Sequence, residues 1–194
     1  MRRRARRGGF GGSFGGLAGG FGGVLRRKKR FSLWALATLL ISACAVKEIA
    51  PELQKGDIVT AKVISVYDGD TLTALVKNSR VKVRLYGIDA PEAKQKGGEA
   101  SARFARKVCL DKTATIEIKS TDKYGRKVGV VTCGSDETSL NRQLVANGHA
   151  WAYTQYSKIY KLDELNARRK KVGLWREKNP QNPADFRRSH SNQH

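Results

Sequence analysis

The stretch DIVTAKVISVYDGDTLTALV, residues 57–76, has the pattern of a β-hairpin. Residues 57–67 are rich in Val and Ile and predict a strand, Asp68-Gly69 supplies the turn, and residues 71–76 predict the returning strand. Asp70 follows the turn directly, so two carboxylates lie where the chain reverses. Such carboxylates often only cap or solvate the turn. Whether these two also belong to a functional site depends on the residues in the rest of the chain.

Short strands and helices follow the hairpin. Three further strands are predicted, over 80–88, 113–120 and 127–133. Three helices are predicted, over 97–110, 139–148 and about 157–172. Five strands with a helix after the third describe an α+β fold, a closed five-stranded β-barrel of the oligonucleotide-binding kind with three helices.

The composition is strongly basic. The 194 residues carry 38 Lys and Arg against 17 Asp and Glu, a formal net charge of +21, and the 40% of hydrophobic residues are enough for a folded core. Residues 1–43 hold ten basic residues and no acid, so 28 basic and 17 acidic side chains remain beyond them. Because this surplus persists outside the first 43 residues, it favours a polyanionic partner, nucleic acid or an anionic membrane surface, over a merely soluble basic surface.

The first 43 residues have the composition of an unfolded leader followed by an export signal. Residues 1–23 are rich in Arg and Gly, with too little apolar content to fold, so we expect them to be disordered. RRKKR (26–30) then precedes FSLWALATLLISA (31–43), a charge-free run of 13 residues that is too short for an ordinary membrane span. A basic region, an apolar region and small residues in this order predict a signal peptide.

The segment ISAC (41–44) resembles the lipobox of bacterial lipoproteins, with Ile41 in place of the usual Leu. The resemblance implies cleavage before Cys44 and lipid attachment to it. The mature protein is then exported and anchored to a membrane, on its periplasmic or extracellular face, through the polar tether 44–56. The alternatives are ordinary cleavage, which leads to secretion, and a cysteine buried in a core helix.

Two cysteines remain beyond the tether, Cys109 and Cys133. They can pair in an oxidising compartment, but their spacing does not show whether their Cα atoms come within bridging distance. A disulfide and two buried thiols both stay open, whereas a zinc site is excluded because no pair of histidines lies nearby. We expect the folded domain over 57–178 and a polar tail, interrupted by prolines, over 179–194.

Charged residues gather at the ends of the predicted strands. RLYGIDAPE places Arg84 on the third strand, Asp89 at its end and Glu92 in a loop that is stiffened by the preceding proline. TDKYGRK presents Arg126 at the entrance to the fifth strand. A hard divalent cation needs clustered oxygen ligands, and phosphodiester cleavage needs a base together with cationic groups on the phosphate. Two Asp, one Glu and two Arg make up that set.

Together, these motifs resemble the thermonuclease, or staphylococcal nuclease-like, family over residues from about 58 to 178. Six segments occur in the family's order and at similar spacing: YDGDT, RLYGIDAPE, EASARFA, TDKYGR, LNRQLVANGHAW and GLW. The resemblance implies an oligonucleotide-binding barrel with three helices, which the periodicity predicts independently. It also implies a Ca²⁺-dependent endonuclease that acts on DNA and RNA and leaves their sequence largely unread.

The resemblance also assigns roles to the acidic motif. It implies that Asp70 and Asp89 are carboxylate ligands of a Ca²⁺ ion. The backbone carbonyl of Ala90, where the family's archetype has Thr, is implied as a further ligand. Glu92 is implied as the general base that activates the attacking water. Without the resemblance, the two aspartates are ordinary turn and strand-end residues, and Glu92 is a solvated loop acid.

Arg84 and Arg126 are implied to bind the scissile phosphate and to stabilise the charge that builds up as water adds. Their alternative is a surface position or an ion pair. We expect Asp122 and Lys123, in the same turn as Arg126, to be turn and surface residues.

The alternative function is a catalytically silent nucleic-acid-binding barrel, because this fold hosts both activities. The three acids favour the nuclease, since a decayed copy is expected to lose them. Tyr153 and Tyr156 either stack on a base or pack in the ordinary way, and His149 is expected to be structural. No protein partner is inferred, and a monomer is expected.

Overall fold

The structure is a computed structural model that describes residues 52–191. The predicted leader, signal peptide, lipidated Cys44 and most of the tether lie outside the described residues. Within residues 52–191, no helix is both long enough and apolar enough to cross a membrane.

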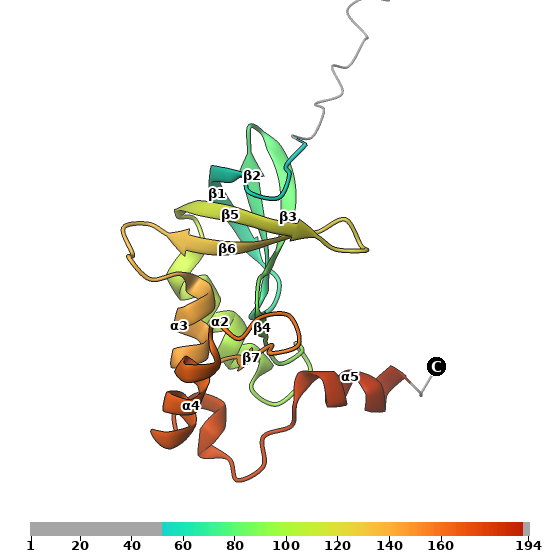
Figure 1. Cartoon of the computed structure of the whole chain (residues 1–194), viewed down its shortest axis with the longest axis vertical. Helices are drawn as coiled ribbons and strands as arrows, with labels where there is room; N and C mark the ends of the chain where they lie inside the picture. The colour runs from blue at the N-terminus through green and yellow to red at the C-terminus, as the bar shows by residue number, and fades with distance from the viewer. Residues whose placement is uncertain (1–51, 192–194) are drawn as a thin grey trace, which may run out of the picture. The chain divides into compact units, whose positions relative to one another are not determined.

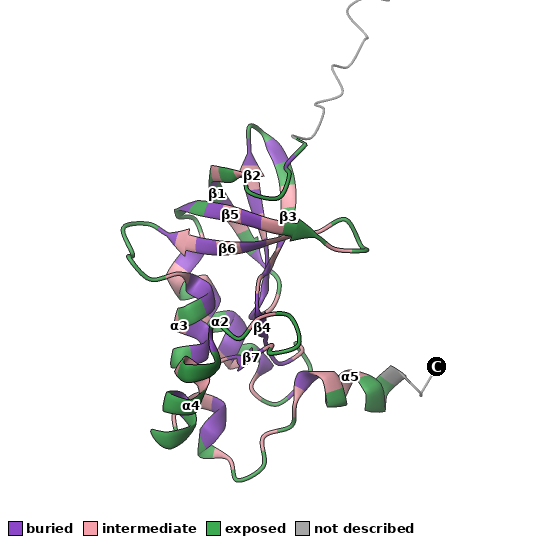
Figure 2. Cartoon of the chain, in the orientation of Figure 1, coloured by how far each residue is buried: buried purple, intermediate pink, exposed green. Residues whose placement is uncertain are grey.

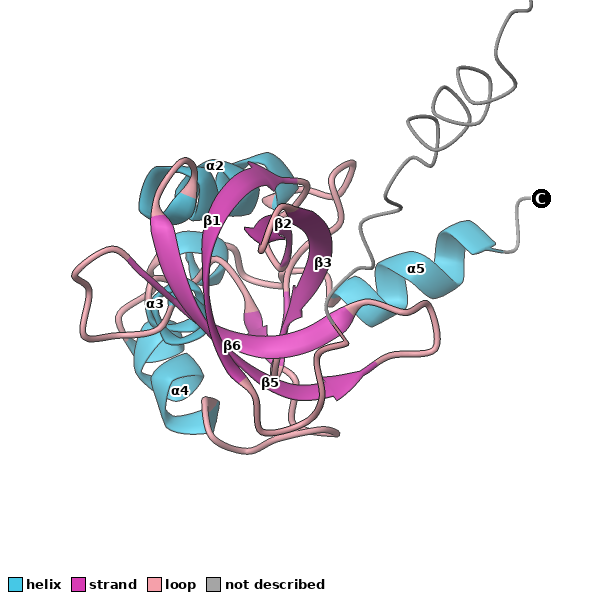
Figure 3. Cartoon of the chain, turned by 90° about the horizontal axis from the view of Figure 1, so that it is seen from above, coloured by secondary structure: helices cyan, strands magenta, loops and turns pink. Residues whose placement is uncertain are grey.

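Five strands close into a barrel, which is seen from above in Figure 3. They are β1 (Ile58–Val66), β2 (Thr71–Val76), β3 (Ser79–Leu85), β5 (Thr113–Thr121) and β6 (Lys127–Cys133). Their order around the barrel is β1-β2-β3-β6-β5; β3 and β6 pair in parallel, and the other neighbours are antiparallel. The predicted fold class is confirmed.

Apolar side chains from all five strands fill the barrel. Successive residues of a strand point to opposite faces, so every second side chain turns inward. Val63, Val83, Ile116 and Val131 are fully buried in this way, and Figure 2 shows the buried positions along the strands in purple. Burying each such side chain contributes roughly 1.5–3 kcal/mol, so the barrel is a rigid base for the loops at its ends.

The predicted turn between β1 and β2 is present and packs against a helix. Asp68 Oδ1 accepts a hydrogen bond from the backbone N–H of Asp70 at 3.0 Å. A Cβ atom on Gly69 would lie 1.8 Å from Ser101 Oγ, so only glycine lets the turn approach this helix so closely. The turn residues thus fix the position of Asp70 at the start of β2.

Three helices lie at one end of the barrel (Figure 1). They are α2 (Gly98–Cys109), α3 (Leu140–Ala146) and α4 (Lys161–Arg169), and a short 3₁₀ helix, η1 (Gly173–Arg176), follows α4. α2 contacts β1, and α3 contacts β6. The third helix is shorter than predicted because the chain at 157–160 turns to bury Tyr160 in the core.

The predicted third strand breaks before its end. β3 stops at Leu85, Gly87 adopts a φ of +73°, and the next two residues, β4 (Ile88–Asp89), pair with β7 (Trp151–Ala152) instead of continuing along the barrel. The fully buried side chain of Asn141 stabilises this break, because its amide donates to the Tyr86 carbonyl at 2.9 Å. The break turns Asp89 away from the barrel wall and toward Asp70.

The predicted polar tail contains a helix, α5 (Pro183–Ser191), on the right of Figure 1. Asn182 caps it, since its Oδ1 accepts a hydrogen bond from the Ala184 N–H at 2.9 Å. Pro183 occupies the first helical position, where a missing N–H is tolerated and a fixed φ is favourable. The second proline of the tail therefore starts a helix instead of interrupting structure.

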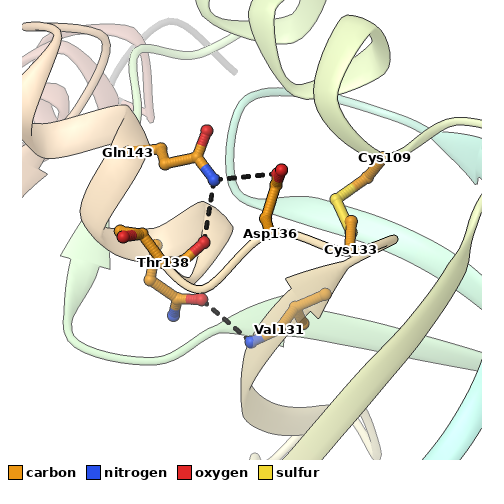
Figure 4. Close-up of a disulfide and its surroundings, with 7 residues drawn as sticks. Cys109, Val131, Cys133, Asp136, Thr138 and Gln143 are labelled. Carbon is orange, nitrogen blue, oxygen red and sulfur yellow. Dashed lines mark hydrogen bonds between the residues drawn. A yellow bond between two sulfur atoms is a disulfide. The ribbon is translucent and has the colours of Figure 1, made fainter.

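A disulfide joins the end of α2 to the end of β6 (Figure 4). Cys109 and Cys133 lie with their Cα atoms 5.3 Å apart, and both are buried. Nearby, Gln143 of α3 donates to Asp136 and to the Thr138 carbonyl, which ties down the loop after β6. The pairing that the spacing of the cysteines left open is formed in the structure.

Candidate active site

Arg84 joins the two aspartates that the sequence predicts as metal ligands. Its Nη1 donates to Asp70 Oδ1 at 2.6 Å, and its Nη2 donates to Asp89 Oδ1 at 2.9 Å. Asp70 is 3% exposed and Asp89 is 2% exposed. Asp70 directly precedes β2, Arg84 lies on the neighbouring strand β3, and Asp89 ends β4, so the two aspartates meet at one guanidinium.

Both oxygens of Asp70 are held by the protein. Oδ1 also accepts from the Thr71 hydroxyl at 3.1 Å, and Oδ2 accepts from the Ala90 N–H at 2.8 Å. Burial raises the pKa of Asp70 to about 7, although the positive charge of Arg84 acts in the opposite direction. Ala90 thus serves the site through its N–H, and the role of its carbonyl as a metal ligand stays a prediction.

Glu92 lies in the loop that follows β4, at the mouth of the site. Its side chain is 36% exposed, and its backbone N–H donates to Gln95 Oε1 at 3.1 Å. The loop packs tightly against the start of α2, since a Cβ atom on Gly98 would lie 2.0 Å from the Glu92 carbonyl oxygen. This packing holds Glu92 beside the buried aspartates while leaving its carboxylate accessible to water.

A third arginine, Arg187 of α5, completes the cluster and was not predicted from the sequence. Its Nη2 donates to Asp89 Oδ2 at 2.9 Å, and its Nη1 donates to Asp89 Oδ1 at 3.1 Å and to Glu92 Oε1 at 2.7 Å. Hydrogen bonds to Asp89 and Glu92 raise the pKa of Arg187 further above its ordinary value. Acids and arginines therefore alternate along the site: Asp70, Arg84, Asp89, Arg187 and Glu92.

The signal for this arginine is local and weak. Asn182 followed by Pro183 is a helix-start pattern, and it predicts a helix at Arg187 but not where that helix docks.

Arg126 reaches the site from the turn between β5 and β6. Its Nε donates to Asp122 Oδ2 at 2.7 Å, and Asp122 Oδ1 accepts from the N–H groups of Tyr124 and Arg126, each at 2.9 Å. Slight burial would raise the pKa of Asp122, but these hydrogen bonds outweigh it and lower the pKa below its ordinary value. Asp122, which was expected to be only a turn residue, thus orients Arg126.

A groove of about 1070 Å³ passes this cluster, although the buried Asp70 and Asp89 are not among its lining residues. The three predicted catalytic residues Arg84, Glu92 and Arg126 all line it, together with Arg187. Its walls carry five tyrosines and two lysines, namely Tyr67, Tyr86, Tyr124, Tyr153, Tyr156, Lys82 and Lys123. Such a groove, with cationic groups above buried acids and aromatic rings along its length, suits an extended polyanion that has flat bases.

Comparison with known proteins agrees with this geometry. Residues 82–177 match the family model described as staphylococcal nuclease homologue. An "Uncharacterized endonuclease" of Haemophilus influenzae is 40% identical over 168 residues, which cover 85% of this chain and 88% of that protein. The chain belongs to the staphylococcal nuclease-like family. It is also similar to a "Micrococcal nuclease" of Shigella flexneri, at 35% identity over 170 residues, covering 81% of this chain and 97% of that protein.

The family resemblance of the motifs is thereby confirmed, and the protein is a phosphodiester-hydrolysing nuclease. Three of the motifs that carried the resemblance supply the predicted site residues. Asp70 comes from YDGDT, Arg84, Asp89 and Glu92 come from RLYGIDAPE, and Arg126 comes from TDKYGR.

The acidic pair of this nuclease fits a hard cation. Asp70 Oδ1 and Asp89 Oδ1 accept from the same guanidinium, so a positive group already bridges the two oxygens. Ca²⁺ takes carboxylate, carbonyl and water oxygens, six to eight in all. Within residues 52–191, no group of three His, Cys, Asp or Glu side chains is poised to hold a metal ion. An ion at this pair would therefore draw its remaining ligands from main-chain carbonyls and water.

Proposed function

We propose that the nuclease is a Ca²⁺-dependent endonuclease that hydrolyses DNA and RNA with little sequence specificity, outside the cytoplasm. The observation that carries the proposal is the arrangement of Asp70 and Asp89 on Arg84, with Glu92 beside them at the mouth of the groove. Glu92, Arg84 and Arg126 line one groove, and Asp70 and Asp89, the proposed cation ligands, are hydrogen-bonded to Arg84.

Each group has a chemical role in hydrolysis. Asp70 and Asp89, with the Ala90 carbonyl, would hold the ion, which when bound supplies positive charge to the phosphate oxygens. Glu92 takes a proton from the water whose oxygen forms the new bond to phosphorus. Arg84 and Arg126 bind the phosphate oxygens and stabilise the negative charge that accumulates before the ester P–O bond breaks.

The walls of the groove support a broad substrate range. Tyrosine rings stack on any base, and lysines bind any phosphate, so neither reads sequence or sugar. Tyr153 and Tyr156, whose rings lie 4.8 Å apart, form one such surface. The same walls support the alternative function, a barrel that binds nucleic acid without cleaving it.

Two features support a location outside the cytoplasm. Residues 26–44 have the order of a signal peptide that ends in a lipobox-like segment. The buried Cys109–Cys133 disulfide is typical of oxidising compartments. We extend the proposal to lipid attachment at Cys44, because ISAC (41–44) resembles a lipobox. The lipid chains of a lipoprotein would hold the nuclease firmly at a membrane.

Digestion of nucleic acid by the protein comprising residues 45–194 tests the activity. We expect plasmid DNA and RNA to be degraded with Ca²⁺ and to stay intact with a chelator. Binding is measured in parallel by gel shift under the chelator. If the protein shifts both nucleic acids in the gel but cleaves neither at any Ca²⁺ concentration, the silent binding barrel would be favoured.

Expression of the full chain in a bacterial host tests the anchor. Wild type is expected to pellet with membranes and to label with palmitate, whereas Cys44→Ser should not label. A soluble, unlabelled wild-type protein would replace the lipoprotein by an ordinarily secreted nuclease.

A further inference from the structure

Arg187 occupies the acids that the proposed function requires to be free. Asp89 accepts hydrogen bonds from Arg187 at both carboxylate oxygens, and Glu92 accepts one from the same guanidinium. Asp89 therefore binds both Arg84 and Arg187, whereas Asp70 binds Arg84 but not Arg187. A guanidinium that binds a carboxylate through two N–H groups occupies the lone pairs that a metal ion would use.

The segment that leads to α5 is fastened to the loop that carries Glu92. The buried side chain of Gln95 donates to the Gln181 carbonyl at 2.7 Å and accepts from the Glu92 N–H at 3.1 Å. Lys96 and Glu177 form an ion pair at 3.2 Å. Because these contacts lie outside the acid cluster, the helix stays tethered beside the site even when Arg187 leaves it.

We propose that Arg187 competes with the divalent cation for Asp89 and Glu92, so that α5 keeps the cation-free site closed. The inference rests on the proposed Ca²⁺ site. A cation at Asp89 repels the neighbouring guanidinium and takes the oxygens that it binds, so the ion and the docked Arg187 exclude one another.

Comparing wild type with Arg187→Ala and Arg187→Gln shows whether Arg187 competes with Ca²⁺ for the acids or supports the Ca²⁺ site. The two variants remove the same contact in different ways. Arg169→Ala on α4 is the charge-matched control, because Arg169 is exposed and lies outside the groove. Ca²⁺ affinity is measured by titration calorimetry without nucleic acid, so the readout does not depend on cleavage. Thermal unfolding in the absence of Ca²⁺ checks that every variant is folded.

We expect both Arg187 variants to bind Ca²⁺ about tenfold more tightly than wild type, which corresponds to α5 being docked in roughly nine molecules out of ten. Arg169→Ala should match wild type. By linkage, Ca²⁺ should also loosen the helix, so hydrogen exchange at residues 183–191 of wild type should speed up when Ca²⁺ is added. In Arg187→Ala this exchange should be fast with or without Ca²⁺.

Weaker Ca²⁺ binding by the Arg187 variants would overturn the proposal and make Arg187 a support of the site. Equal binding by all proteins would also overturn it, while leaving the Ca²⁺ site of the proposed function intact. Absence of Ca²⁺ binding in every protein would reject both the competition and the Ca²⁺ requirement.

Discussion

At the scale of single residues, Glu92 is the group whose chemistry is easiest to isolate. Glu92→Gln keeps the shape of the side chain and removes its basicity, so turnover should fall by about 10²–10⁴-fold with nucleic-acid affinity little changed. Initial rates and gel shifts measure the two quantities. Glu99→Gln, which alters an exposed acid on α2, should keep full activity. A fully active Glu92→Gln variant would remove Glu92 from the mechanism.

Asp70 should determine how much Ca²⁺ the enzyme needs for activity, because it is predicted as a ligand of the ion and not as the base. Asp70→Asn removes one charged ligand from the predicted pair, so the Ca²⁺ concentration for half-maximal activity should rise by about tenfold or more. The matched control is Asp111→Asn, because Asp111 is exposed and forms its ion pair with Lys62, away from the arginines of the site. An unchanged Ca²⁺ requirement in Asp70→Asn would contradict the assignment of Asp70 as a ligand.

The motif residues could be predicted because their positions depend on short stretches of chain. Asp70 follows a turn whose geometry Asp68 and Gly69 determine, and Glu92 follows a stiff proline loop. Arg187 could not be predicted in the same way. It reaches Glu92 from 95 residues further along the chain, and the contact depends on how the tail packs, which no local pattern encodes.

At the scale of elements, the interface between α2 and the end of α3 contains a titratable ring. His149 follows α3, and its ring lies 4.6 Å from that of Phe104 on α2. Burial, with the charge of Arg103, lowers the pKa of His149 below its ordinary value of 6.5. His149, which the sequence indicated as structural, thus lies in a helix contact.

This shift predicts an effect of pH on stability. Between the lowered pKa and about 6.5 the unfolded chain binds a proton at His149 that the folded chain does not, so His149 contributes a fall in the free energy of unfolding as the pH is lowered through this range. Asp70, whose pKa is raised to about 7, contributes a change of the opposite sign, because its folded form holds a proton that its unfolded form has lost. Urea unfolding at pH 7.5 and 5.5 measures the change. On going from pH 7.5 to 5.5, the free energy of unfolding of His149→Gln should fall less, or rise more, than that of wild type. An equal change in both proteins would assign the pH dependence to groups other than His149.

Sequence patterns predicted where the helices and strands lie more accurately than where each of them begins and ends. The five long strands and three of the helices lie close to their predicted ranges, because alternation and stop signals are local. The break after β3 depends instead on Asn141, which comes from a helix far along the chain and binds the Tyr86 carbonyl. The start of α4 was likewise shifted by the burial of Tyr160, a tertiary effect.

At the scale of the whole molecule, the disulfide links the helical end to the barrel. Closing a loop between Cys109 and Cys133, 24 residues apart, should stabilise the fold by about 3 kcal/mol. Cys133→Ser should lose this amount in denaturant unfolding. Wild type treated with a reductant should lose the same amount, and the reductant should not affect the variant. A variant as stable as oxidised wild type would show that the link contributes nothing.

The disulfide also makes the stability of the nuclease depend on the redox state of its surroundings. A broad nuclease endangers the genome and transcripts of its producer from the moment it is synthesised. In a reducing cytoplasm the link between Cys109 and Cys133 does not persist, so the reduced chain is less stable than the disulfide-bonded one. If the nuclease is exported as proposed, its full stability arises only after it has left the nucleic acids of its own cell behind.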